Sequence, residues 1–485
     1  MPYSGEGSSP TAHVDIIRSP EVAEFLKTCT YNPDPSSRVA EIFSRLVDVS
    51  DRVRRIDDGV ILATDGSPYE AIIEKRFPSV RVGFLKLSNV LILVPEYRRL
   101  QGASSPFVDP REVARIQRGT QSLSLVLPGS GIVKDGIADS RSFFRQALFN
   151  AFISPTFAVS GIRLYDTLIE LLRKTGSIVV RGEREGIVFG KGRKSPADDD
   201  ELAAEFFVPL DPGWALSPTS VSAPVYVTDA LRVHEPFIDD GSNMECFNRL
   251  MTALEHILTI HLIRCAWKID PSVTDNMHVI VDGPLAIFGE PARFHRGIMS
   301  VLHDIRMSAR SRGQPGPLVL GFSKSGKVVE HATLIERYMR YLEDGKTLRT
   351  GTWILPIDDK YRQIFVQPTG LPRDRNFGDD TYYGQHFLVR TAQGKVFDTC
   401  LAYPVPNKNQ VEGRDFRDVK VDLSAYGDDI GRAVSLIEMM QMDLYDNSMI
   451  AVHLAHKYAS IAHSPSGRSL DQFVREIIKP RAATR

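Results

Sequence analysis

The sequence predicts an α/β fold in which a mixed β-sheet is flanked by helices. Short runs rich in Val, Ile and Leu, typical of buried strands, recur along the chain, and longer segments carry apolar residues at helical spacing. From residue 242 onward the two patterns alternate as helix, strand, helix, strand, which is the order of a βαβ-like unit. With 485 residues, the chain is long enough for two or three subdomains or for one large decorated domain.

The first half of the chain combines N-terminal helices with a meander of strands. A serine precedes a helical apolar pattern at 19–29 and again at 36–55, as a helix N-cap would. Apolar runs at 59–67 and 79–95 predict two adjacent strands. Farther along we expect a strand at 121–131, helices at 142–152 and 163–176, a hairpin at 177–190 and a charged, Pro-containing loop at 190–201.

The second half begins with the most regular helix, at 242–267, where apolar residues recur at helical spacing. This helix leads directly into a strand that ends on Asp282. A helix at 292–313 and a strand at 317–326 are expected next. The last third predicts strands at 350–357, 361–368, 385–392 and 396–405, and helical structure from 427 to 463.

The composition is that of an ordinary soluble globular protein, with 42% apolar and 25% charged residues. Because 59 Lys and Arg oppose 60 Asp and Glu, any polyanionic partner must meet local positive charge. The four cysteines are far apart and form no Cys-x-x-Cys pair, which favours reduced thiols in a cytoplasmic protein. The N-terminus lacks the pattern of a signal peptide and no long apolar run occurs, so we expect neither secretion nor a membrane span.

Two aspartates stand where an apolar strand is expected to end. Asp65 follows "VILAT" and Asp282 follows "VIV", and each precedes a glycine. Asp-Gly is a good turn dipeptide, and a turn accounts for either one alone. The pair favours a ligand site, because open α/β sheets bind ligands at the carboxyl ends of strands and an unpaired buried charge is costly.

A divalent cation such as Mg²⁺ or Mn²⁺ would offset the cost of these two charges. Such ions prefer oxygen ligands, and sites with two ions gather several carboxylates. A third carboxylate is therefore expected, and the helix at 242–267 offers Glu245 and Glu255. Glu255 lies in a largely apolar stretch, although an exposed position on an amphipathic helix accounts for it equally well.

Histidines and cationic residues supply further candidates. His453 and His456 share one helix face, and the near-neutral pKa of histidine suits a metal ligand or a proton donor to a leaving oxygen. A core or capping role is the alternative for both. Candidates for contact with a nucleic-acid backbone are Lys324 in "GFSKSGK", Arg145 in "SRSFFR" and Arg249, a neighbour of Glu255 on its helix. The patterns of a Walker phosphate loop and of serine or cysteine hydrolases are absent.

Five segments together resemble the NurA-domain nucleases, which are the nuclease partners of HerA-type hexameric DNA-translocating ATPases. They occur in the order of that family, and the likeness lies in their succession because each is short. The segments are "DGSPYEA…PSVRVGFLKLSNVLI" at 65–92, "FNRLMTALEHILTIHLIR" at 247–264, "VIVDGPL" at 279–285, "LVLGFSKSGKVVEHATLI" at 318–335 and "LYDNSMIAVHLAHKYASI" at 444–461.

The resemblance implies an RNase H-like core with inserted and terminal helical segments. It divides the chain into an N-terminal helical segment at 1–58, a nuclease domain at 59–465 with an elaborated region at 100–240, and a C-terminal tail or helix at 466–485. It also implies a homodimer that docks on a HerA-like ATPase, and hydrolysis of DNA that favours Mn²⁺, with exonuclease and single-strand endonuclease activity. By position, Asp65, Glu255, Asp282 and His456 match the residues of the family's site. The position of the family's tyrosine holds Ser448 here, so Tyr445 is nominated instead.

We therefore expect a metal-dependent DNA nuclease with a two-metal site, acting on single strands and duplex ends in DNA end processing or in defence against foreign DNA. Asp65, Glu255 and Asp282 would bind Mn²⁺ or Mg²⁺, and His456 would be a ligand or a proton donor. One alternative is a non-catalytic adaptor or DNA-binding subunit of a ring ATPase with the same fold. Another is a guide-dependent effector that resembles the Argonaute group.

Overall fold

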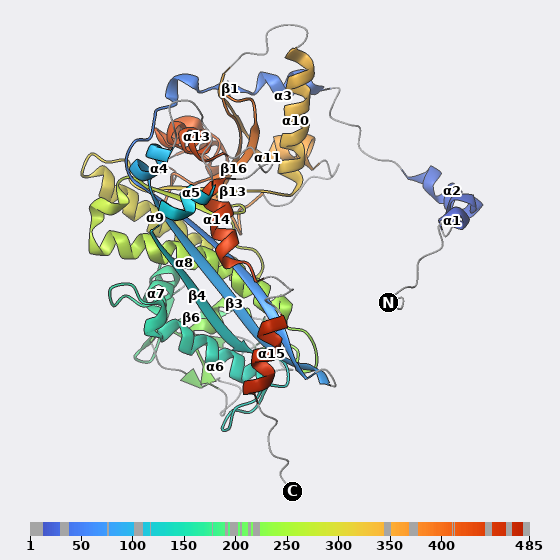
Figure 1. Ribbon diagram of the computed structural model, residues 1–485, viewed down its shortest axis with the longest axis vertical. Coiled ribbons are helices and arrows are strands. Elements are labelled where there is room, and N and C mark those ends of the chain that lie inside the picture. Colours follow the sequence, from blue (N-terminus) through green and yellow to red (C-terminus); the bar gives the residue numbers. More distant parts are fainter. Residues whose placement is uncertain are drawn as a thin grey trace.

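The protein forms a large mixed β-sheet with helices on both faces, as the computed structural model shows in Figure 1. The structure describes residues 13–29, 38–74, 77–100, 110–116, 118–176, 178–189, 193–194, 202–203, 206–211, 215–216, 224–343, 351–367, 377–409, 411, 413–441, 449–461 and 468–478. The predicted α/β class with a mixed sheet is confirmed. Across these residues, no helix has the length and apolar character that crossing a membrane requires.

The main sheet has nine strands within the described residues. Strand β12 lies parallel to its neighbours β2 and β13, and all other neighbouring strands are antiparallel. The five strands β4, β3, β2, β12 and β13 are adjacent in that order, with only β3 reversed among them, as in an RNase H-like core. In spatial order the strands are β1 (Val47–Asp48), β14 (Trp353–Pro356), β15 (Gly384–Arg390), β16 (Val396–Ala402), β13 (Leu318–Phe322), β12 (Met277–Asp282), β2 (Val60–Glu74), β3 (Phe77–Leu93) and β4 (Arg118–Pro128).

Helices bury both faces of this sheet. Leu62 of β2 packs on the face that carries α6, α7, α8 and α9, whereas Ile61 and Ala63 pack on the face that carries α13 and α14. Because both faces are covered, the strand is a continuous apolar run instead of an alternating one. The bounds of these helices are α6 Ser140–Ile153, α7 Leu164–Arg173, α8 Met244–Ile269, α9 Phe294–Arg310, α13 Asp429–Met440 and α14 Ile450–Ala459.

The remaining elements are shorter or lie at the periphery. The N-terminal helices α1 and α2 lie apart from the rest of the molecule in Figure 1, and Ser19 caps α2 as predicted. The other helices are α1 Val14–Arg18, α2 Pro20–Thr28, α3 Val39–Ser44, α4 Val94–Leu100, α5 Pro110–Ile116, α10 Lys327–Glu343, α11 Asp359–Tyr361, α12 Phe416–Val419 and α15 Arg468–Ile477. Smaller sheets contain β5 (Ile178–Arg181), β6 (Arg184–Phe189) and β9 (Phe206–Pro209), then β7 (Arg193–Lys194) with β8 (Leu202–Ala203), and β10 (Ala215–Leu216) with β11 (Pro224–Val225).

Strand β2 is longer than predicted, and this corrects the interpretation of Asp65. Strand β2 does not end at Asp65 but continues to Glu74, and Asp65 pairs with Ser88 of β3 inside the ladder. Strand β12, in contrast, ends at Asp282, where Gly283 takes a positive φ of 91°. Only the second Asp-Gly pair therefore ends a strand. A turn does not account for the first pair, since it lies within the ladder.

Two other segments differ from the prediction. In the segment 361–368, expected as a strand, Tyr361 ends α11 and a π-helical turn follows at Arg362–Val366. The apolar residues Tyr361, Ile364 and Phe365 follow the spacing of a helix, and Asp358 caps the turn through the N–H of Tyr361. The helix expected over 36–55 stops at Ser44, because the following residues join the edge of the main sheet as β1.

Candidate metal centre

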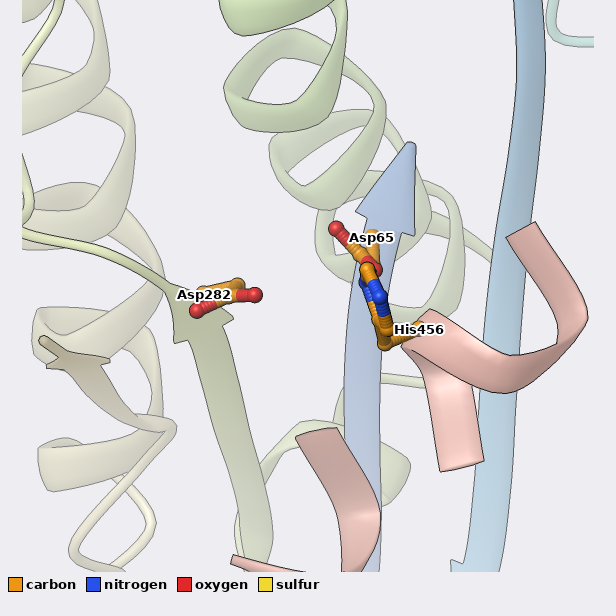
Figure 2. Close-up of side chains that lie close together, drawn as sticks. All are labelled: Asp65, Asp282 and His456. Carbon is orange, nitrogen blue, oxygen red and sulfur yellow. The ribbon is translucent and has the colours of Figure 1, made fainter. Parts of the chain in front are cut away.

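Asp65, Asp282 and His456 converge where strand β12 ends beside β2. One ligand atom from each side chain lies within 4.8 Å of the others. Figure 2 shows the carboxylates of Asp65 and Asp282 facing the same space, with the imidazole of His456 against Asp65. These three side chains come from β2, the end of β12 and α14, and so from distant parts of the chain.

The register of the parallel strands sets the two carboxylates side by side. Val281 pairs with Thr64, so the next residues on the two strands, Asp282 and Asp65, occupy the same level. Along β2, Asp65 is on the same face as Ile61 and Ala63, because side chains alternate along a strand. That face is covered by α14, and His456 of this helix places Nδ1 2.8 Å from Oδ2 of Asp65.

Glu255 approaches the same place from the opposite face of the sheet. It extends from α8, and its Oε1 would lie 3.0 Å from a Cβ added at Gly66, the residue after Asp65. The backbone N–H of Gly66 lowers the pKa of both Asp65 and Glu255, against the larger effect of burial. Glu255 is not among the three residues whose ligand atoms lie within 4.8 Å of one another. It is a further carboxylate next to that group.

The charges of these carboxylates oppose one another. Burial raises the pKa of Asp65, Asp282 raises it further, and His456 acts in the other direction. Burial raises the pKa of Glu255 well above its usual range, and the charges of Asp65 and Asp282 add to the shift. Without a cation, the site therefore favours a protonated Glu255.

Two carboxylates and an imidazole fit a divalent cation such as Mn²⁺ or Mg²⁺. Carboxylate oxygens are the ligands these ions prefer, and imidazole suits the softer members of the series. A bound cation would also stabilise the ionised forms of Asp65 and Glu255, which the protein alone disfavours. The donor set thus supports the expectation of a metal site.

The predicted cationic residues have different surroundings. Lys324 follows β13 and donates from Nζ to Oδ2 of Asp282 at 2.7 Å, so it belongs to the centre itself. Arg249 lies on α8 and pairs with Glu245 of the same helix at 2.6 Å. Tyr445, nominated as the site tyrosine, lies outside the described residues.

Arg145, which the sequence predicts to contact DNA, is buried in an ion pair instead. It lies on α6, where its Nε and Nη2 donate to the two carboxylate oxygens of Asp229 at 2.9 and 2.7 Å. Each of these two side chains is only 2% exposed. The two arginines of "SRSFFR" suggest a cationic surface, but Arg145 lies on the buried face of α6.

Replacing Arg145 by alanine is expected to lower the free energy of unfolding by about 3–5 kcal/mol, because it leaves a buried carboxylate without its partner. Urea unfolding followed by circular dichroism measures this loss. The matched control is Arg163→Ala, which removes the exposed partner of Asp166 and should cost less than about 1 kcal/mol. A similar small loss for both variants would contradict a stabilising role for the buried pair.

Two features of the centre escaped the sequence analysis. Gly66 has the sequence context of a turn residue, yet it lies in the ladder of β2, where a Cβ would meet Sδ of Met251 at 2.2 Å and Oε1 of Glu255 at 3.0 Å. The ion pair between Lys324 and Asp282 was also missed, since the residues are 42 positions apart. The signal that could have indicated it is a pair of predicted strands in one βαβ-like unit, of which one ends on Asp282 and the other is followed by Ser323 and Lys324.

No protein-family model and no curated protein matches this chain. Among solved structures, it is similar to the NurA nuclease from Sulfolobus solfataricus, with 10% identity, a TM-score of 0.35, and coverage of 96% of this chain and 94% of that one. A second NurA structure has 10% identity, a TM-score of 0.26 and coverage of 95% and 98%. A structure of NurA with manganese has 10% identity, a TM-score of 0.27 and coverage of 96% and 98%.

These three NurA structures are among the solved structures to which this mixed α/β chain is similar.

Proposed function

We propose that this protein is a metal-dependent nuclease that hydrolyses DNA phosphodiester bonds. The convergence of Asp65, Asp282 and His456 within 4.8 Å is the observation that supports this most directly. Hydrolysis of phosphodiesters needs charge stabilisation on phosphate oxygens, which clusters of carboxylates with divalent ions supply. The succession of NurA-like sequence segments supports DNA as the substrate, since the composition does not select it.

The residues of the centre would have separate roles in metal binding and in proton transfer. When bound, Mn²⁺ or Mg²⁺ would polarise the phosphate and lower the pKa of a water molecule. Asp65, Asp282 and His456 would hold one ion, and Glu255 would help to hold a second. The hydrogen bond between His456 and Asp65 orients the imidazole, which also suits proton transfer at the leaving oxygen.

The assembly in which this site acts is part of the proposal. A chain with a net charge of −1 attracts a polyanion only weakly over long distances. A translocating partner that delivers the strand would remove that limitation, and a HerA-like hexameric ATPase fits this need. We further propose a homodimer that docks on the ATPase ring and processes DNA ends or foreign DNA.

The direct test is incubation of the purified protein with single-stranded and linear duplex DNA and Mn²⁺, with and without a HerA-like ATPase. Products that appear with Mn²⁺ and are suppressed by EDTA are expected. Absence of product under both conditions would favour the alternative, a non-catalytic adaptor. Short nucleic acids that copurify with the protein would instead favour a guide-dependent effector.

A further inference from the structure

Lys324 forms an ion pair with one of the carboxylates of the candidate metal centre. Its Nζ lies 2.7 Å from Oδ2 of Asp282, and the two side chains are 34% and 23% exposed. The contact follows from the sheet, because Asp282 pairs with Phe322 on the parallel strand β13. The loop that begins after Phe322 therefore starts beside Asp282 and brings Lys324 to it.

The charge of this ammonium acts across the whole centre. It lowers the pKa of Glu255, against the effects of burial and of the neighbouring aspartates. Burial lowers the pKa of His453, which is on the same helix as His456, and the charge of Lys324 lowers it further. Lys324 thus supplies positive charge at the place where carboxylates repel one another.

A single positive charge cannot replace a divalent ion, and the two compete for the same carboxylate. A metal ion that takes Asp282 as a ligand must displace the ammonium or share its oxygens. Both side chains are partly exposed, so breaking this pair is cheap compared with breaking a buried one. The flexible stem of a lysine also lets the ammonium move to a nearby anion.

We propose that Lys324 is a displaceable counter-ion of the metal centre, which holds Asp282 when no metal is bound and turns to a DNA phosphate when metal binds. The proposal rests on the proposed function and adds the regulation of its site. Release of Lys324 by the metal strengthens DNA binding, and by linkage DNA strengthens metal binding by the same factor. The lysine thereby makes occupancy of the centre depend on substrate.

The first test measures Mn²⁺ affinity without DNA. Electron paramagnetic resonance of free Mn²⁺ is recorded during titration of the wild type and of Lys324→Met. The variant is expected to bind Mn²⁺ about five- to tenfold more tightly, because the metal no longer competes with a partly exposed ion pair. Lys324→Arg, which keeps the charge, should stay close to the wild type.

A matched control is available in the same segment. Lys327 begins α10 and pairs with Glu330, and these side chains are 63% and 67% exposed. Lys327→Met removes the same charge three residues farther along the chain and should leave the Mn²⁺ affinity within about twofold of the wild type. Equal gains in both variants would show a general effect of charge and would overturn the proposal.

The second test repeats the titration with a nuclease-resistant single-stranded phosphorothioate oligonucleotide. For the wild type, the oligonucleotide is expected to tighten Mn²⁺ binding, and in Lys324→Met this enhancement should shrink or disappear. An equal enhancement in both proteins would overturn the coupling. Weaker Mn²⁺ binding by Lys324→Met in the first test would also overturn the proposal, because it would show that Lys324 supports the metal ligands.

These measurements distinguish a failure of the counter-ion proposal from a failure of the proposed nuclease function. A wild type that binds no Mn²⁺ contradicts the metal centre and, with it, the counter-ion. A wild type that binds Mn²⁺ and cleaves DNA, with an unchanged affinity in Lys324→Met, overturns only the counter-ion.

Discussion

Replacing Asp282 by asparagine is expected to lower Mn²⁺-dependent DNA cleavage by roughly a thousandfold, because the site loses a charged ligand for the ion. Asp65→Asn should have a similar effect, since both carboxylates belong to the group of three within 4.8 Å. The substitution keeps the shape of the side chain, so the fold should survive. Initial rates on a labelled single strand, compared with circular dichroism of the same preparations, measure both properties.

Glu245→Gln is the matched control for these variants. Glu245 lies on the same helix as Glu255, but it is exposed and pairs with Arg249. It should retain activity within about twofold, because removal of a surface ion pair has little energetic effect. Full activity in folded Asp282→Asn or Asp65→Asn would refute the proposed chemistry.

Replacing Glu255 by glutamine is expected to stabilise the metal-free protein as the pH rises. Burial and the charges of Asp65 and Asp282 raise the pKa of Glu255 well above the value of an unfolded chain. Between these two pKa values the folded protein holds a proton that the unfolded chain has lost, so the free energy of unfolding falls with increasing pH. Glutamine carries no such proton, and the variant should show a flatter pH dependence.

Urea unfolding at several pH values from 5 to 8 in EDTA measures this difference. The same experiment with Mn²⁺ gives the metal contribution, because an ion at a hundred times its dissociation constant stabilises the folded state by about 2.7 kcal/mol. The wild type should show this gain, and Asp282→Asn should lack it. Parallel pH profiles for the wild type and Glu255→Gln would contradict the assigned proton on Glu255.

Much of the fold followed from local patterns. The long apolar helix at 242–267 became α8, and the helix at 292–313 with its flanking strands became a parallel βαβ unit. Apolar periodicity was sufficient there because these segments bury regular faces. It failed at 361–368, where four apolar residues among eight fit a strand or a helix, and the cap from Asp358 decided for the helix.

For the candidate site, the sequence predicted the residues but not their distances. The identities of Asp65, Glu255, Asp282 and His456 came from the sequence, through residue chemistry and the order of NurA-like segments. Their distances did not, because they depend on the register of β2 against β12 and on the packing of α8 and α14 on opposite faces. Arg145 and Lys324 are both cations in segments that predict contact with DNA. The packing of helices and strands decides that Arg145 is buried against Asp229 and that Lys324 pairs with Asp282.

The sequence by itself determined which side chains can bind a divalent cation and where most of the strands and helices lie. Only the tertiary structure decided that Asp65 lies inside a strand, that Arg145 is buried against Asp229, and that Lys324 rests on Asp282. The physical reason is range. Periodicity and capping act within a few residues, whereas a metal centre and its counter-ions depend on contacts between strands and helices far apart in the chain.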